Sequence, residues 1–97
     1  MPFAIVLAPE AVEDLRGLTA NVRATVRTAL EAHLRHGPER TSRSRIKWLR
    51  GLLRPQYRLR VSEVRVFYDV SGTTVEVLAM VPKSEAEAWL AQFADPE

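Results

Sequence analysis

The chain has 97 residues, a length that allows one domain with one modest core. Its apolar fraction of 46% and charged fraction of 27% are ordinary for a globular protein and give no indication of disorder. It has no cysteine, which excludes disulfides and thiolate metal sites, and no apolar run of the roughly 18–20 residues that span a bilayer. We therefore predict one soluble domain over residues 1–97, and a start without signal-peptide features fits a cytoplasmic location.

The N-terminal part of the chain predicts one strand followed by two helices. Residues 3–8 form a short apolar run typical of a strand, and Pro9 then occupies a position favoured in the first turn of a helix. Apolar residues recur at helical spacing as far as Leu34. Gly17 predicts a break, so we expect a helical hairpin that ends at a stop at 37–38, Gly–Pro.

The C-terminal half predicts three strands and a short helix. A basic loop is expected at 39–46, before the first of these strands. The strands are expected at about 55–61, 64–71 and 74–81, joined by turns short enough for antiparallel hairpins. Pro82 ends the third strand, and Ser84, with Glu87 three residues later, has the spacing of a capping box, which predicts that Ser84 caps the last helix.

The order β-α-α-β-β-β-α predicts an α+β fold: a small antiparallel sheet with an N-terminal helical hairpin and a short C-terminal helix. We expect the helices to pack largely on one face of the sheet, leaving the other face, or a groove beside it, open to solvent. In the first strand of this sheet Arg58 and Arg60 alternate with apolar residues and share one side. Together with Arg65 on the next strand, they should point toward the open face.

Positive charge is concentrated in the middle of the chain. Ten Lys or Arg residues and only two acids lie from Arg35 to Arg65, so this segment carries +8 and the remainder −6. Because the planar fork of arginine matches phosphate oxygens, we interpret the basic surface as a site for nucleic acid or another polyanion. The alternative is a solvated surface on which the arginines form ion pairs with Asp69 or Glu76 across the sheet.

Other site chemistry is sparse in this sequence. It contains no P-loop, no GxGxxG and no HExxH motif. His33 and His36 lie near the end of the second helix, where interaction with the helix dipole is the main interpretation and a metal-binding pair the alternative. No carboxylate near them completes a ligand set. We therefore predict no metal site and no cofactor.

The segment "IKWLRG…QYRLRVSEVRVFYDVSGTTVEVLAMVPK", after a strand and a helical hairpin, resembles the RelE/ParE superfamily of bacterial toxins from type II toxin–antitoxin modules. The most specific part is residues 47–70, with Lys-x-Leu-x-Gly at 47–51 followed by "YRLRV" and "VRVFYDV". The resemblance runs over nearly the whole chain, is closer to the RelE branch, and implies a RelE-like fold.

Toxins of the RelE branch are ribosome-dependent endoribonucleases that cut mRNA without a metal. The ribose 2′-OH attacks the adjacent phosphate and leaves a cyclic phosphate and a free 5′-OH. The resemblance thus implies an mRNA interferase that inhibits translation. The catalytic residues it implies are Arg58, Arg60, Arg65, Lys83 and Trp89. The RNA-binding residues we predict are Arg43, Arg45, Lys47, Arg50 and Arg54.

Three of these residues limit what the resemblance implies. Arg60 is a poor general base because the pKa of a guanidinium lies above 12. Lys83 offers a point charge where the RelE branch has an arginine. Trp89 stands where that branch has a tyrosine, so it can stack on a base but cannot donate a phenolic proton. Its alternative role is a packing anchor on the apolar stripe of the last helix.

The resemblance also implies partners. They are a cognate antitoxin with an acidic or amphipathic segment, the ribosome and mRNA, without a membrane or a small-molecule cofactor. Two alternatives remain: a ParE-type inhibitor of DNA gyrase that acts by binding, and a catalytically weak RNA-binding relative. ParE-like proteins do not need the basic cluster, so its presence favours the ribonuclease.

Overall fold

The computed structural model describes residues 2–97 and contains the predicted elements together with three further short strands. The helices are α1 Pro9–Arg16, α2 Ala20–Leu34 and α3 Ala86–Phe93, with the 3-10 turn η1 Lys83–Glu85. The strands are β1 Ala4–Leu7, β2 Ile46–Trp48, β3 Leu52–Arg54, β4 Tyr57–Val61, β5 Val64–Ser71, β6 Thr74–Pro82 and β7 Asp95–Pro96. The predicted α+β fold is confirmed. Within residues 2–97, no helix has the length and apolar character needed to cross a membrane.

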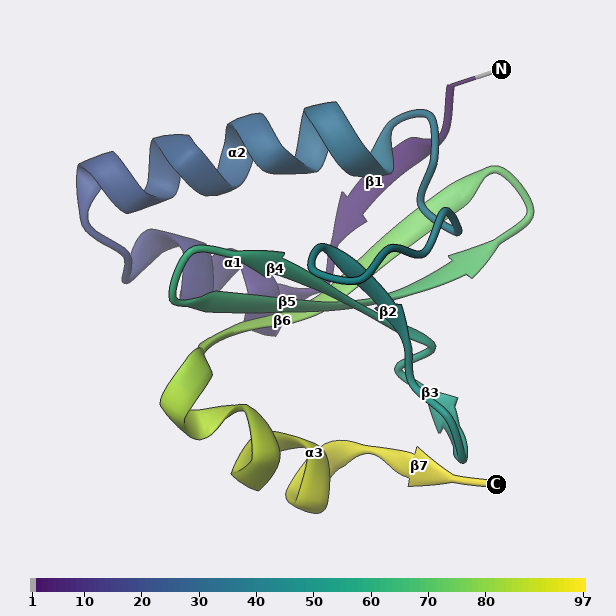
Figure 1. The fold of residues 1–97 in the computed structure, drawn as a ribbon. Coiled ribbons are helices and arrows are strands. Elements are labelled where there is room, and N and C mark those ends of the chain that lie inside the picture. Colours follow the sequence, from purple (N-terminus) through teal and green to yellow (C-terminus); the bar gives the residue numbers. More distant parts are fainter. Residues whose placement is uncertain (1) are drawn as a thin grey trace.

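The main sheet has five strands in the order β1-β6-β5-β4-β2. The pairs β6–β5 and β5–β4 are antiparallel, as expected for consecutive hairpins. The strand β2 also pairs with β4 in the antiparallel sense, whereas β1 joins β6 in parallel. β3 pairs with β7 at the C-terminal end of the chain in a separate two-stranded ribbon (Figure 1). These pairings place β4 and β5, the two arginine-bearing strands, in the interior of the sheet.

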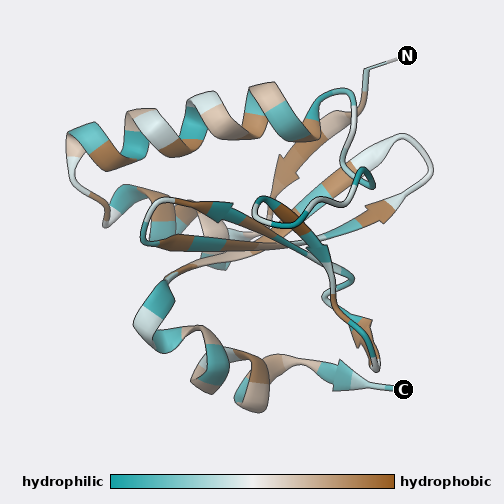
Figure 2. Cartoon of the chain, viewed as in Figure 1, coloured by the Kyte–Doolittle hydropathy of each residue, from teal (hydrophilic) through white to brown (hydrophobic). Residues whose placement is uncertain are grey.

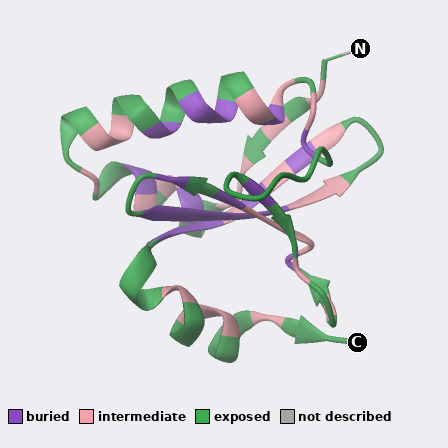
Figure 3. Ribbon diagram, viewed as in Figure 1, coloured by how far each residue is buried: buried purple, intermediate pink, exposed green. Residues whose placement is uncertain are grey.

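The helices cover both faces of the sheet, so the prediction that they lie largely on one face is wrong for α3. The hairpin of α1 and α2 covers one face, and α3 lies against the other (Figure 1). The cause is in β5, which has apolar side chains on both sides: Val66 and Tyr68 pack toward the hairpin, and Phe67 packs toward α3. Figure 3 shows that the strands between the two layers are largely buried.

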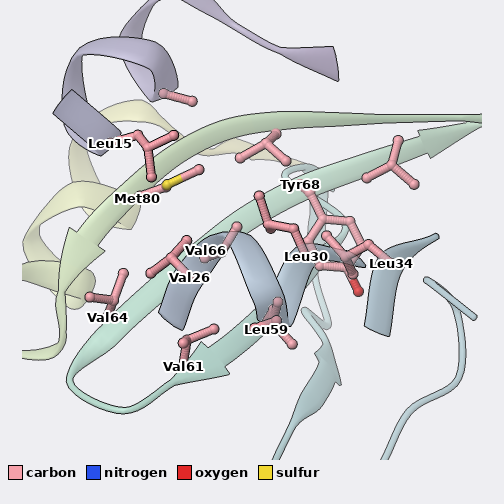
Figure 4. Packing of buried hydrophobic residues seen from close by; sticks show 14 of the residues in the cluster. Leu15, Val26, Leu30, Leu34, Leu59, Val61, Val64, Val66, Tyr68 and Met80 are labelled. Carbon is pink, nitrogen blue, oxygen red and sulfur yellow. The ribbon is translucent and has the colours of Figure 1, made fainter. Parts of the chain in front are cut away.

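The larger core lies between the sheet and the hairpin of α1 and α2, and we call it the α1–α2 core. Val26, Leu30 and Leu34 recur every four residues along α2 and are buried, while its outer surface is more hydrophilic (Figure 2). They meet Leu59 of β4 and Tyr68 of β5 (Figure 4). The apolar face predicted for the helix therefore packs on the apolar faces predicted for the strands.

The predicted cap at Ser84 is wrong. The residue before α3 is Glu85, and no side chain caps the helix. Ser84 lies inside the 3-10 turn η1, which begins directly after Pro82. An N-cap residue needs an extended backbone before the first helical turn, and the 3-10 turn occupies that place.

A β-bulge interrupts the pairing of β5 and β6. Phe67 pairs with Ala79, but the next residue, Tyr68, pairs with Val77, so Leu78 is an extra residue in β6. A bulge of this kind shifts the alternation of the strand that carries it. Before the bulge Val77 faces the α1–α2 core, and after it Ala79 faces α3.

A side chain of α1 satisfies the edge of β6 beyond the bulge. β1 pairs with β6 only as far as Val77, so no strand lies beside the rest of that edge. Asp14 of α1 accepts a hydrogen bond from the Met80 backbone N–H at 2.9 Å. Burial raises the pKa of Asp14, and the bond from Met80 partly opposes this. The contact anchors α1 on the second half of β6.

We expect Tyr68→Phe to lower the free energy of unfolding by about 1–2 kcal/mol. The buried Tyr68 hydroxyl donates to the Pro38 carbonyl at 2.6 Å, and Phe would leave that buried carbonyl without its donor. The matched control is Tyr57→Phe, because the Tyr57 ring stacks on Tyr68 at 5.5 Å and its hydroxyl makes no hydrogen bond within residues 2–97. Urea denaturation should show little change for the control, and equal losses in both variants would contradict the assignment.

Candidate functional site

Arg58, Arg60 and Arg65 lie on the same face of the sheet, as predicted. Leu59, between the first two, is fully buried in the α1–α2 core, so its two neighbours project to the opposite face. Arg65 follows the same rule between the buried Val64 and Val66. The three arginines therefore belong to the face that α3 covers in part, and the prediction that they point toward an open face is wrong for Arg65, which is buried.

The strand register brings these three positive charges close together. Arg60 lies directly opposite Arg65, and Arg58 lies opposite Phe67, two residues further along β5. Like charges directly opposite each other destabilise a sheet. Burial, followed by the charges of Arg65 and Arg60, lowers the pKa of Arg58 from its ordinary value. Arg58 Nε is also sealed from solvent with no hydrogen-bond partner within residues 2–97.

Arg65 is the most buried charged residue of the cluster, with 6% of its surface exposed. Its Nη1 donates to the carbonyl oxygens of Ser62 at 2.9 Å and Val64 at 3.1 Å. No carboxylate in the described part of the chain pairs with it. A buried charge needs compensation, and here the protein supplies only the partial charges of two carbonyls. The site therefore keeps a net positive charge.

The carboxylates expected to neutralise this cluster pair with a different arginine. Arg54 lies 3.5 Å from Asp69 and 3.1 Å from Glu76, measured between the charged atoms. Asp69 also accepts a hydrogen bond from the Gln56 N–H at 2.8 Å. Burial raises the pKa of Asp69, while Gln56 and Arg54 oppose that shift. The alternative of ion pairs from the three clustered arginines to these acids is thus wrong, and Arg54, predicted to bind RNA, is itself neutralised.

Two lysines border the cluster. Lys47 of β2 lies opposite Arg58 and is exposed. Lys83 follows directly after β6, where Arg65 pairs with Val81. Its backbone N–H donates to the Glu63 carbonyl at 2.7 Å, which fixes the start of η1 against the β4–β5 turn, while its side chain is exposed. Both lysines place an exposed positive charge at the margin of the arginine cluster.

Trp89 makes three contacts in the smaller core, which lies between the sheet and α3. Its ring is stacked on Phe67 at 4.9 Å with an interplanar angle of 3°, and it also meets Phe93 at 5.4 Å. Its Nε1 donates to Glu10 Oε2 at 2.8 Å. These contacts match the packing alternative for this residue. Its catalytic role stays a prediction.

The other basic residues predicted to bind RNA lie outside the sheet cluster. Arg43 is exposed in the loop before β2, and the Arg50 guanidinium lies 6.0 Å from the Trp48 ring centre. Arg45 Nη1 lies 2.9 Å from His33 Nε2. Burial and then the charge of Arg45 lower the pKa of His33, which favours a neutral ring that accepts this bond.

The region around His33 offers no metal ligand set. Within residues 2–97 no three His, Asp or Glu side chains are arranged to hold a metal ion. His33 bonds a cation from the neighbouring loop. The interaction of His33 and His36 with the helix dipole stays a prediction.

Sequence reasoning missed the two residues of the β4–β5 turn, Ser62 and Glu63. Their backbone carbonyls accept the bonds from Arg65 and Lys83 described above. A carbonyl is common to every residue, so side-chain patterns carry no information about it. The short length of the turn was the only sign that the two strands come this close to η1.

The family model for the ParE toxin of the type II toxin–antitoxin system parDE matches residues 5–87 of the chain. A search of curated proteins gives no sequence match. Among solved structures, a chain of the toxin–antitoxin complex RelBE2 from Mycobacterium tuberculosis is similar, with a TM-score of 0.72 and 25% identity over 84% of this chain and 92% of that one.

Two further solved structures share the fold at lower sequence identity. One is a mutant of Escherichia coli toxin RelE in the free state, with a TM-score of 0.67 and 23% identity over 92% of each chain. The other is a chain of the RelB–RelE antitoxin–toxin complex from Methanococcus jannaschii, with a TM-score of 0.65 and 19% identity. It covers 87% of this chain and 96% of its own.

We expect Arg58→Met to leave the free energy of unfolding unchanged or to raise it by up to about 1 kcal/mol at low salt, because it removes like-charge repulsion and an unpartnered Nε. Arg54→Met is the matched control: it breaks two ion pairs and should lower stability by about 0.5–1 kcal/mol. Urea denaturation at low and high salt measures both, and screening should shrink the difference. A loss at Arg58 as large as at Arg54 would contradict the unpaired state of Arg58.

Proposed function

Because the chain belongs to the ParE toxin family of type II toxin–antitoxin systems, we propose that it is a RelE-like toxin that cleaves mRNA on the ribosome. The observation that supports this is the group of Arg58, Arg60 and Arg65, which share one sheet face and have no carboxylate partner within residues 2–97. Arginines that serve only the fold are usually paired. An unpaired group of this kind favours an anionic ligand, and a nucleic-acid backbone supplies regularly spaced anions.

The spacing of the arginines fits one strand of RNA. Alternate residues on a strand are about 6.6–7 Å apart, which is comparable to the spacing of neighbouring phosphates. Arg58 and Arg60 would thus contact adjacent phosphates, while Arg65 approaches from the next strand. Lys47 and the exposed arginines of the basic loop would extend the contact along the RNA or onto the ribosome.

The proposed reaction is an internal transfer at one phosphate. The ribose 2′-oxygen forms a bond to phosphorus as the bond to the 5′-oxygen breaks; the 2′-OH gives its proton to a solvent water, and the 5′-oxygen gains one. Extra negative charge develops on the phosphate oxygens, and Arg58 and Arg65 would stabilise it. Lys83 is the proposed proton donor to the 5′-oxygen, since a guanidinium does not release a proton in proteins.

We further propose a cognate antitoxin as the partner that neutralises the toxin. Similar chains from Mycobacterium tuberculosis and Methanococcus jannaschii were solved in complexes with their antitoxins. An acidic or amphipathic antitoxin segment would complement the unpaired arginines. The ribosome and mRNA are the proposed targets, which sets the proposed location in the cytoplasm.

The second candidate is a ParE-type inhibitor of DNA gyrase. It is favoured by the name of the matching family model and by the packing of Trp89, which engages the indole of the last helix in the core. A gyrase inhibitor that acts by binding would not depend on the arginine cluster for bond cleavage. The two functions therefore differ in which substitutions abolish toxicity.

The test is in vitro translation with added protein, with mRNA ends mapped by primer extension. We expect cuts only in the presence of ribosomes, and a loss of about a hundredfold or more in cleavage rate for Arg58→Ala and for Arg65→Met. Arg16→Ala is the control, because Arg16 is an exposed residue of α1 paired with Glu13. Intact mRNA together with inhibited gyrase supercoiling would replace the ribonuclease with the second candidate.

A further inference from the structure

The turn between β4 and β5 has an unusual backbone. Ser62 has φ 53°, in the left-handed region, and is the only residue other than glycine with a positive φ within residues 2–97. Side chains disfavour this region, which glycine enters freely. Gly51 and Gly72 have the other positive φ values in the described chain. The two-residue hairpin turn requires such a φ at its first central residue, and here a serine takes the place that glycine usually fills.

The two carbonyls of this turn each hold a member of the candidate site. The Ser62 carbonyl accepts from Arg65 Nη1 at 2.9 Å, and the Glu63 carbonyl accepts from the Lys83 N–H at 2.7 Å. The left-handed φ at Ser62 is part of the geometry that directs its carbonyl toward the guanidinium. One two-residue turn thus sets both the most buried arginine and the start of the segment that carries Lys83.

We propose that Ser62 is a positioning residue of the site, which holds the Arg65 guanidinium in its working orientation through the left-handed turn. The proposal rests on the function given above, in which Arg65 contacts phosphate. The Ser62 and Val64 carbonyls occupy only Nη1. Nε and Nη2 of Arg65 make no hydrogen bond within residues 2–97, so both keep their donor capacity for a phosphate.

The carbonyl partner explains how the arginine is fixed without losing its charge. A carboxylate in the same place would neutralise the guanidinium and compete with a phosphate. A carbonyl offers only a partial negative charge, so it orients Nη1 and leaves the net charge of the group intact. Glu63 fits this account, since it contributes its carbonyl and its exposed carboxylate forms no ion pair in the described chain.

The chain offers a matched control for backbone strain. Gly72, in the turn between β5 and β6, has φ +60° and open space around the position of a Cβ. It lies at the opposite end of the β5–β6 hairpin, beside the Ser71–Thr74 pair, whereas Arg65 pairs with Val81. A β-branched residue at Gly72 would therefore strain a similar backbone without contact to the cluster.

The experiment compares Ser62→Val, Ser62→Gly and Gly72→Val with the wild type. Three quantities are measured: the unfolding midpoint in urea, the Nε–Hε NMR signal of Arg65 in the free protein, and affinity for a short single-stranded RNA. We expect both valine variants to lose stability, but only Ser62→Val to move the Arg65 signal and weaken RNA binding by about tenfold. Ser62→Gly should keep both the Arg65 signal and the RNA affinity of the wild type, because glycine retains the left-handed backbone.

Two outcomes would overturn the proposal: Ser62→Val with an unmoved Arg65 signal, or Gly72→Val with the same loss of RNA affinity as Ser62→Val. If Ser62→Val does not fold, Ser62→Ala imposes the same backbone preference more mildly and takes its place. A wild-type protein that neither binds nor cleaves RNA would refute the proposed function instead. In that case the Arg65 signal alone decides whether the turn fixes the guanidinium.

Discussion

The bulge at Leu78 determines which side chains each face of the sheet receives. Strict alternation would carry the inward face of Val77 on to Ala79, and the second half of β6 would then face the wrong layer. The extra residue reverses this, so Ala79 packs toward α3. Asp14 stabilises the shifted strand by accepting the Met80 N–H where β1 no longer covers the edge. By the same alternation Val81, the partner of Arg65, also packs toward α3, so the layer in which the arginines lie depends on one added residue.

Charge is distributed unequally between the two ends of this sheet. At one end Arg54 forms ion pairs with both Asp69 and Glu76, and that group carries a formal charge of −1. At the other end Arg60 and Arg65 lie opposite each other, and neither forms an ion pair with an acid within residues 2–97. Such an arrangement costs stability in the free protein through self-repulsion, and a bound anion relieves that cost. The same electrostatics would serve two proposed partners, an RNA phosphate and the acidic segment of an antitoxin.

Local patterns in the sequence were sufficient for the strands that carry the arginines. Arg58 and Arg60 alternate with apolar residues between short turns, so both the strand and the side on which its arginines lie followed from the period of two. The strands β2 and β3 were missed because each has only three residues, and their pairing depends on β4 and on the distant β7. The position of α3 did not follow from the sequence, because Phe67 is a single apolar residue among arginines on the second face and gives no clear apolar stripe for a helix to cover. Ion-pair choice and the bulge depend on tertiary packing that no local pattern contains.

The packing of Trp89 bears on how the site works. Its stack on Phe67 and its bond to Glu10 join α3 to β5 and to α1, so the indole cannot leave without breaking two interfaces. Phe67 in turn lies opposite Arg58, the arginine whose Nε is sealed from solvent. An apolar neighbour lowers the local dielectric, and a charge acts more strongly on a phosphate where less water screens it. Trp89 cannot act as a proton donor in catalysis. By holding Phe67 beside Arg58, it can still strengthen the attraction between the arginine cluster and a phosphate.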